Sequence, residues 1–228
     1  MTYTSPYYKK NTTCQLCHHD FQTTNILSRF VKFSGRDTDF FPFYQDINLN
    51  PLYYHIHICP KCGFAYTEEF SSYFPPLTKE KIQDKLLATQ IKDFGGIRTL
   101  ENVKEAYNRA LACAHLKNEK NIVIGGLYMR MAWIQRMLHS KEQEQYFLSK
   151  TCDYYVQSYQ LDDFAKTKMS ETRLLYLIGE CYRRLGNYKE AISYYGKVVE
   201  KKRHTSEQRI IEMARDAWYR ARQESKAI

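Results

Sequence analysis

The sequence predicts an α+β protein that is mostly α-helical, in which a small zinc-ribbon-like module precedes antiparallel helix pairs of the tetratricopeptide type. One observation predicts the ribbon: the first part of the chain contains two Cys-x2-Cys motifs, made by Cys14, Cys17, Cys59 and Cys62. A second observation predicts the helices, because from residue 78 onward apolar side chains recur at helical spacing. We therefore expect two domains, residues 1–77 and residues 78–228.

The two cysteine motifs predict a structural Zn²⁺ site. Two thiolates separated by two residues face one point, and two such turns supply four sulfur ligands in tetrahedral geometry. Pro60 and Gly63 suit the second turn, because proline fixes φ and glycine permits a left-handed backbone. The 41 residues between Cys17 and Cys59 exceed the spacing of about 15–20 in a simple ribbon, so we interpret this region as a ribbon with a long insertion. The alternative is a set of free or disulfide-bonded cysteines.

Histidines near the motifs leave a further alternative open. Each of four could replace a thiol or contact a ligand, although a solvent-facing position is the simpler interpretation: His18, His19, His55 and His57. An all-cysteine site has no open coordination position, which argues against metal catalysis. The sequence also has no Gly-rich phosphate loop, His-Glu-x2-His helix or nucleophile elbow. We expect a protein that is not an enzyme.

The net charge of +9 is concentrated in the second half of the chain. Residues 1–77 contain six Lys/Arg and six Asp/Glu, whereas residues 78–228 contain 28 and 19. No stretch is long and apolar enough for a membrane span, and the N-terminus lacks the apolar region of a signal peptide. Seven cysteines, an odd number, fit a reducing compartment. We expect a cytoplasmic protein that does not bind membranes.

The elements of the first domain follow from composition. Residues 1–13 are polar and predict a loose arm, and residues 20–33 are compatible with one or two short strands. Residues 52–58 are rich in β-branched and aromatic side chains, which predicts a strand that delivers the second cysteine motif. Residues 64–66 would be its partner strand. The pair of prolines within residues 71–76 marks the domain boundary.

The second domain is predicted to be helical throughout. Thr78 is a suitable N-cap for the first helix, and the Gly95-Gly96 pair ends it. The later helices are separated by short polar turns. The expected helices cover approximately residues 79–94, 100–117, 123–139, 141–164, 171–185, 188–203 and 206–225.

One helix pair matches the tetratricopeptide pattern at nearly every signature position. The matching residues are Ile178, Gly179, Tyr182, Gly186, Tyr188, Ala191 and Tyr195. Gly179 and Ala191 would keep the contact between the two helices small, and tyrosines would fill the surrounding gaps. Leu175 stands where the repeat usually has tryptophan, and no proline closes the unit. Residues 123–164 resemble a degenerate copy, and residues 206–225 a terminal cap.

The groove of these helices is the candidate site for a partner. Its concave face would carry Arg173, Tyr176, Glu180, Arg183 and Arg184, joined by Met129, Trp133 and Arg136 from the preceding pair. Arginine side chains could hold an acidic peptide or a C-terminal carboxylate while the aromatic side chains pack its apolar residues. The alternative is a solvated basic face.

Two charged runs have both a structural and a functional interpretation. Arg36, Asp37 and Asp39 could bind a ligand or partner, but an arginine between carboxylates more often holds an irregular loop together. The run at residues 201–204 is compatible with phosphate neutralisation in nucleic-acid binding. Cations that offset a helix dipole are the simpler account of that run.

The chain resembles a bacterial family catalogued as domain of unknown function 2225. The resemblance spans nearly the whole chain, and its shared elements are the first Cys-x2-Cys, Arg36-Asp37-Thr38-Asp39-Phe40 with Tyr44, Asn50-Pro51 with Tyr54, Cys59-Pro60-Lys61-Cys62-Gly63-Phe64-Ala65, and a helical half that ends near Met213-Ala214-Arg215-Asp216-Ala217-Trp218. Phe41 is a departure, because members of that family often have cysteine there. The resemblance implies a zinc-ribbon-like module joined to tetratricopeptide-like helices in a cytosolic protein, with no known activity.

The leading functional hypothesis is therefore a non-enzymatic, zinc-stabilised adaptor that binds a protein segment, expected to be acidic, in a basic and aromatic groove. The alternative is an RNA- or DNA-binding protein that uses the basic C-terminal helices. A third hypothesis is a switch in which the motif thiols oxidise and release zinc. The sequence does not specify an oligomeric state.

Overall fold

A computed structural model describes residues 5–87, 94–201 and 206–226 of the chain. The chain divides into two compact units. The N-terminal unit comprises Met1–Gly35 and Pro42–Glu119, and the helical unit comprises Arg36–Phe41 and Lys120–Ile228. A short segment from the first part of the sequence thus belongs to the helical unit, and it is important for the site described below.

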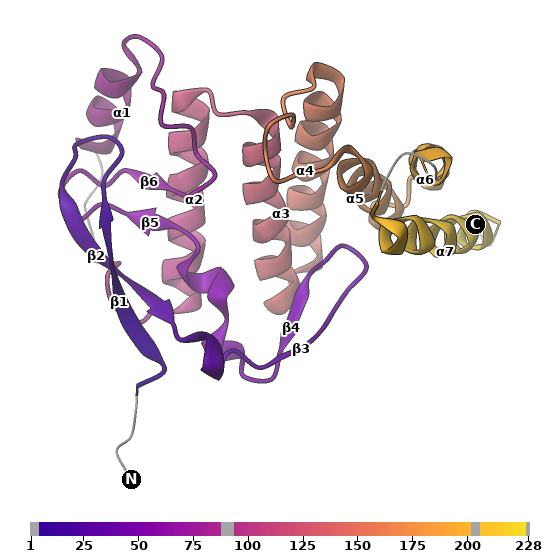
Figure 1. Ribbon diagram of the computed structural model, residues 1–228, viewed down its shortest axis with the longest axis horizontal. Coiled ribbons are helices and arrows are strands. Elements are labelled where there is room, and N and C mark those ends of the chain that lie inside the picture. Colours follow the sequence, from indigo (N-terminus) through magenta and orange to yellow (C-terminus); the bar gives the residue numbers. More distant parts are fainter. Residues whose placement is uncertain (1–4, 88–93, 202–205, 227–228) are drawn as a thin grey trace. The chain divides into compact units, whose positions relative to one another are not determined.

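The N-terminal unit begins with a β-hairpin, drawn in indigo in Figure 1. Strand β1 (Tyr7–Thr13) pairs antiparallel with β2 (Asp20–Ile26), with Tyr7 opposite Ile26 and Thr13 opposite Asp20. The prediction of a loose arm over residues 1–13 was therefore wrong for Tyr7–Thr13. The first cysteine motif forms the turn between the two strands, so the arm folds back and pairs along its whole strand length.

The predicted strand over residues 52–58 begins as a 3₁₀-helix and is a strand only at its end. Pro51–Tyr54 forms η3, and only His57–Ile58 forms a strand, β5, which pairs with β6 (Ala65–Tyr66) as expected. The Asn50 side chain accepts a hydrogen bond from the Leu52 N–H and caps the turn, while proline sits at its first position. The apolar composition reflects burial of this turn and not a strand.

Further short elements and two helices complete the N-terminal unit. Helix α1 spans Thr78–Leu87, and residues 88–93 of the predicted first helix lie outside the described residues. Helix α2 spans Leu100–Lys117, as predicted, between a Thr99 capping box and Asn118 in a left-handed conformation. The remaining elements are η1 (Ser28–Phe30), β3 (Phe33–Arg36), β4 (Pro42–Tyr44), which pairs with β3, and η2 (Ile47–Leu49).

The compact units do not follow the predicted boundary between residues 77 and 78, because α2 packs on the N-terminal unit. The Tyr107 hydroxyl donates a hydrogen bond to the Leu52 carbonyl at 3.1 Å. The buried Arg98 guanidinium, just before α2, donates to the Tyr53 carbonyl at 3.0 Å. These buried bonds tie α2 to η3, so the unit extends to Glu119.

The helical unit consists of antiparallel helix pairs (Figure 1). Helix α3 packs on α4, α5 on α6, and α6 on α7. Their bounds are α3 Asn121–Met137, α4 Lys141–Leu161, α5 Glu171–Arg184, α6 Tyr188–Glu200 and α7 Gln208–Glu224, close to the predicted ranges. The protein is thus α+β and mostly α. Within the described residues, no helix is both long and apolar enough to cross a membrane.

Gly179 is a position of close contact between α5 and α6. A Cβ added there would lie 2.8 Å from Cε1 of Tyr195. Tyr195 is fully buried, and its hydroxyl donates to Glu180 at 2.8 Å, so its ring has no room to retreat. The contact that the sequence pattern predicted therefore depends on the absence of a side chain.

We expect Gly179→Ala to lower the unfolding free energy of the helical unit by about 1–3 kcal/mol through overpacking. Gly196→Ala is the matched control on α6, because a Cβ at Gly196 meets nothing within 4 Å. Replacing this helical glycine with alanine should raise the unfolding free energy of the helical unit by up to about 1 kcal/mol. Urea titration followed by tryptophan fluorescence measures both variants, since Trp133 and Trp218, the two tryptophans, belong to the helical unit. Equal urea midpoints for the two variants would show that Gly179 is not in tight contact with Tyr195.

Candidate functional site

Two features of the structure have the chemistry of a site: the four motif cysteines in the N-terminal unit, and a charged network in the helical unit. The sulfur atoms of Cys14, Cys17, Cys59 and Cys62 all lie within 4.8 Å of one another. Cys14 Sγ is 3.6 Å from Cys62 Sγ, and Cys17 Sγ is 3.7 Å from Cys59 Sγ. Four Zn–S bonds of about 2.3 Å at tetrahedral angles would place sulfurs about 3.8 Å apart. The four cysteines therefore fit a metal ion such as zinc.

The two cysteine turns have the same backbone design. The Cys14 N–H donates to the His19 carbonyl and its carbonyl accepts from the His18 N–H. The Cys59 N–H likewise donates to the Phe64 carbonyl, and its carbonyl accepts from the Gly63 N–H. The fifth residue of each turn has positive φ, 57° at His18 and 72° at Gly63. Each turn thus reverses the chain and aims its two sulfurs at the same point.

The four thiols are free of disulfide bonds. The hydrogen bond between the Cys14 and Cys62 sulfurs lowers the pKa of Cys14 and raises the pKa of Cys62. Burial raises the pKa of Cys59 to about 11. Four thiolates at this spacing would repel one another, so a divalent cation is what would make the fully ionised cluster stable.

The neighbouring histidines do not join the cluster. In the part of the chain that the structure describes, the group of side chains able to hold a metal consists of the four cysteines. His18 is exposed, and His57 is buried with its ring 5.5 Å from that of Tyr66. The other three cysteines, Cys113, Cys152 and Cys181, are buried and outside the group.

The charged network of the helical unit is centred on Asp39, whose side chain is completely buried. Its two carboxylate oxygens accept from the Arg136 guanidinium at 2.6 and 3.2 Å. The Trp133 indole N–H donates to the same carboxylate at 3.1 Å, and the Phe41 backbone N–H donates at 3.2 Å. A buried carboxylate thus receives a bidentate arginine and two further donors, which compensates for its lost hydration.

The residues next to Asp39 are held by α5. Asp37 lies 2.8 Å from Arg184 and 3.0 Å from Arg136. The Tyr176 hydroxyl donates to the Thr38 carbonyl at 2.8 Å, and the Thr38 hydroxyl donates to Glu180. Segment 36–41 is therefore bound to α3 and α5 through both its side chains and its backbone.

Glu180 organises the arginines of α5 from within the core. It is completely buried and accepts from Arg183 at 2.6 Å, from Arg184 at 3.0 Å and from Tyr195 at 2.8 Å. Burial alone would raise the pKa of Glu180, but the hydrogen bonds from Arg183 and Thr38 and the charges of both arginines outweigh it, so its pKa lies below the ordinary value. Glu180 thus stays ionised and fixes the two arginines beside the segment.

Aromatic contacts accompany the charged ones. The Phe41 ring lies 6.1 Å from that of Trp133 and beneath the Arg136 guanidinium, with 5.2 Å between the guanidinium carbon and the ring centre. The Phe40 ring lies 5.5 Å from that of Tyr176. Phe40 has a positive φ of 65°, which turns its ring toward α5 while the backbone closes on Asp37.

The structure therefore brings together nearly all the residues predicted to bind a partner, but they contact a segment of the same chain. Trp133, Arg136, Tyr176, Glu180 and Arg184 all contact Arg36–Phe41 through the bonds described above. Arg183 contacts Glu180, and Arg173 lies over the Phe40 ring with 5.6 Å to its centre. Met129 is buried. The predicted groove holds an acidic and aromatic segment, and its use by an external partner stays a prediction.

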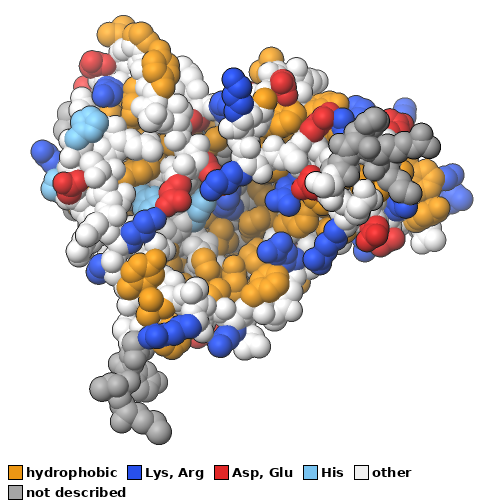
Figure 2. Space-filling model, in the orientation of Figure 1, with side chains coloured by type: hydrophobic (Ala, Val, Ile, Leu, Met, Phe, Trp, Pro, Cys, Tyr) orange, Lys and Arg blue, Asp and Glu red, His pale blue; other side chains and the backbone are white. Residues whose placement is uncertain are grey.

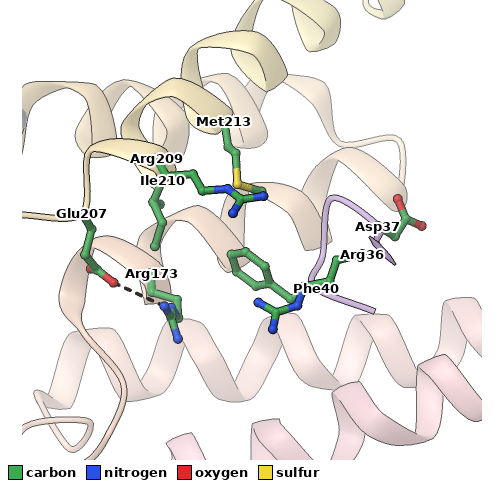
Figure 3. Close-up of a pocket in the computed structure, with 8 residues that line it drawn as sticks. All are labelled: Arg36, Asp37, Phe40, Arg173, Glu207, Arg209, Ile210 and Met213. Carbon is green, nitrogen blue, oxygen red and sulfur yellow. Dashed lines mark hydrogen bonds and ion pairs between the residues drawn. The ribbon is translucent and has the colours of Figure 1, made fainter. Parts of the chain in front are cut away.

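A pocket of about 310 Å³ lies at the edge of this groove. Figure 3 shows the Phe40 ring in its middle, with guanidinium groups around it. The sequence pattern missed the residues that α7 and its N-terminal end contribute, because that helix resembled a terminal cap. The lining residues are Arg36, Asp37, Phe40, Arg173, Glu207, Arg209, Ile210 and Met213. On the face drawn in Figure 2, Lys and Arg side chains likewise lie beside hydrophobic ones.

The network makes the unfolding free energy of the helical unit depend on pH in the acidic range. Burial would raise the pKa of Asp37, but the Thr38 N–H and the two nearby arginines lower it, and the pKa of Glu180 is also lowered. A depressed pKa contributes stability above the unfolded value, about 3.9 for Asp and 4.3 for Glu, and that stability is lost as pH falls through the folded value. We expect urea midpoints from tryptophan fluorescence to be flat from about pH 6 to 5 and to fall below about pH 4.5. Glu180→Gln should be less stable at pH 7 and decline less steeply, and an unchanged acid slope would count against this account.

Comparison with known proteins gives one family match. A family model described as "Uncharacterized protein conserved in bacteria (DUF2225)" matches residues 7–221. The match includes the four cysteines, segment 36–41 and most of α7. No curated protein and no solved structure matches the chain.

Proposed function

The chain belongs to the DUF2225 family, and from this premise we propose that it is a non-enzymatic, zinc-stabilised adaptor whose helical unit binds an acidic segment of another protein. The proposal places the partner on the basic, aromatic surface formed by α3, α5 and α7. In this proposal the cysteine centre stabilises the N-terminal unit and neither binds nor modifies the partner.

One observation carries the proposal: the predicted groove already binds an acidic, aromatic segment. Asp39 receives a bidentate arginine, while the neighbouring Phe41 packs on Trp133. This is the combination of charge-assisted hydrogen bonds and aromatic packing by which proteins recognise acidic peptides. The pocket continues the same chemistry with arginines whose guanidinium groups border open space, so a second segment of this kind has a place to bind.

Zinc is the metal that we propose for the cysteine centre. Four thiolates in a tetrahedral cage favour zinc, and they leave no open position for a substrate. When bound, the ion would cross-link two turns that are more than forty residues apart in the sequence. The reduced thiols that this requires suit the cytoplasm.

Affinity purification from the native bacterium tests the adaptor function. Wild type, Arg173→Gln and the matched control Arg220→Gln would be compared, because both arginines are exposed but only Arg173 lines the pocket. Arg183 and Arg184 are unsuitable, since both hold the buried Glu180. We expect a protein partner that survives nuclease treatment, remains with Arg220→Gln and is reduced with Arg173→Gln.

The same experiment separates the second candidate, nucleic-acid binding. Most of the basic run at residues 201–204 lies outside the described residues, and Lys201 itself forms an ion pair with Glu171 at 2.7 Å. Release of the bound material by nuclease would favour nucleic acid over protein. Absence of any enriched protein would contradict the adaptor.

A further inference from the structure

The arginine pocket, lined by the eight residues given above, has an apolar floor and a basic mouth. The side chains of Phe40 and Met213 are half-buried, and Ile210 is buried beside them. Arg173 and Arg209 are exposed residues on either side of this floor, and Figure 3 shows their guanidinium groups near the Phe40 ring. A ligand that enters the pocket therefore meets cationic groups at the border and apolar surface at the centre.

The acidic side chains of the pocket are already neutralised. Asp37 lies 2.8 Å from Arg184 and 3.0 Å from Arg136, and in Figure 3 its carboxylate points away from Phe40. Glu207 accepts from the Ser170 hydroxyl and lies 3.4 Å from Arg173. Three arginines line the pocket against these two acids, and Asp37 pairs with arginines outside the lining. Cationic charge therefore remains in excess at the mouth, which selects for an anionic ligand.

We propose that this pocket binds a carboxylate together with the large apolar side chain next to it, both supplied by an acidic peptide. This inference rests on the adaptor function and specifies its binding site. A volume of about 310 Å³ is near the lower end for ligand pockets, so it suits one side chain and not a dinucleotide or other large cofactor. The arginine forks match the planar carboxylate, and the floor of Phe40, Ile210 and Met213 matches the apolar side chain.

The segment bound in the neighbouring groove is the precedent for this pairing. There Asp39 is held by Arg136, and Phe41, two residues along, packs against the same guanidinium. The pocket repeats this arrangement with Arg173 over the Phe40 ring at 5.6 Å and Arg209 on the other side. A carboxylate placed between these arginines would leave an adjacent apolar side chain over the floor.

Fluorescence anisotropy with defined probes tests the site. The probes are fluorescein-labelled octapeptides in which Asp or Glu alternates with Phe or Leu, made with a free or an amidated C-terminus, and a matched set with Asn and Gln. The two termini distinguish a C-terminal carboxylate from an acidic side chain as the bound group. A labelled single-stranded RNA 20-mer is the third probe. The proteins are wild type, Arg209→Gln, Arg173→Gln, Met213→Ala and the control Arg220→Gln, each first shown to unfold at the wild-type urea midpoint.

We expect the acidic peptides to bind wild type and Arg220→Gln equally, and to bind Arg209→Gln and Arg173→Gln about tenfold or more weakly, as for the loss of one charge-assisted hydrogen bond. Met213→Ala should weaken the Phe and Leu probes severalfold, and the Asn/Gln set should not bind. Equal binding of acidic peptides to all variants would overturn the proposed binding site but would be consistent with the adaptor function. Binding of RNA, but not of peptides, in an Arg209-dependent way would overturn both.

Discussion

Asp39→Ala is expected to destabilise the helical unit by about 3 kcal/mol, because it removes a buried carboxylate that accepts four hydrogen bonds. The loss is at the lower end for a broken buried ion pair, since Arg136 keeps its ion pairs with Asp37 at 3.0 Å and Glu144 at 2.7 Å. The Asp39 side chain is completely buried, whereas the Arg136 side chain is 17% exposed, so the arginine would keep part of its hydration. Trp133 would also lose the acceptor of its indole N–H. The change should lower the urea midpoint and shift the tryptophan emission, since Trp133 reports directly on this carboxylate.

Asp153→Ala is the matched control, because Asp153 is exposed on α4 of the same unit. Surface substitutions of this kind change stability by about 0.5 kcal/mol or less. If Asp39→Ala and Asp153→Ala gave the same midpoint, segment 36–41 would not be held in the groove in solution. The adaptor proposal would then lose the observation that carries it.

Removal of the zinc ion that we propose for the cysteine centre is expected to unfold the cysteine-bearing part of the N-terminal unit. Structural zinc sites contribute about 10–16 kcal/mol of apparent binding free energy in small peptides, and that energy is folding energy. A chelator should therefore abolish the near-ultraviolet circular dichroism of the tyrosines around β1, β2 and η3. Tryptophan emission should change little, because Trp133 and Trp218 both belong to the helical unit.

Cys62→Ser should reproduce the effect of the chelator, while Cys113→Ala serves as its control. Cys113 is a buried cysteine of the same unit that lies outside the four-cysteine group. Elemental analysis should find close to one zinc per chain in wild type and Cys113→Ala, and far less in Cys62→Ser. Full zinc content in Cys62→Ser would show that the ligands have been assigned wrongly.

The sequence was sufficient to predict the features that depend on local spacing. The cysteine turns need only two intervening residues and a position of positive φ, and the helices need only apolar periodicity. The strand expected at residues 52–58 shows where prediction from local composition fails, because a buried 3₁₀ turn and a buried strand have the same apolar composition. The Asn50-Pro51 pair was the local signal for the turn.

The charged network could not be predicted in the same way, because its contacts join residues far apart in the sequence. Asp39 and Arg136 are 97 residues apart, and Thr38 and Arg184 are 146 apart. The arginines and the acidic loop were each identified as candidates, but no local pattern shows that they contact one another. The contribution of Arg209 and Met213 to a pocket likewise arises only when α7 packs beside α5.

The central claim is that the helical unit accepts a second acidic segment beside the one it already holds. Side-chain NMR tests it directly, by following the arginine Nε–H signals and the Trp133 indole N–H signal as the acidic octapeptide is added. The account predicts that the Arg173 and Arg209 signals shift while the Trp133 signal, bound to Asp39, stays in place. Unchanged Arg173 and Arg209 signals, or loss of the Trp133 signal as the peptide displaces Asp39, would contradict it.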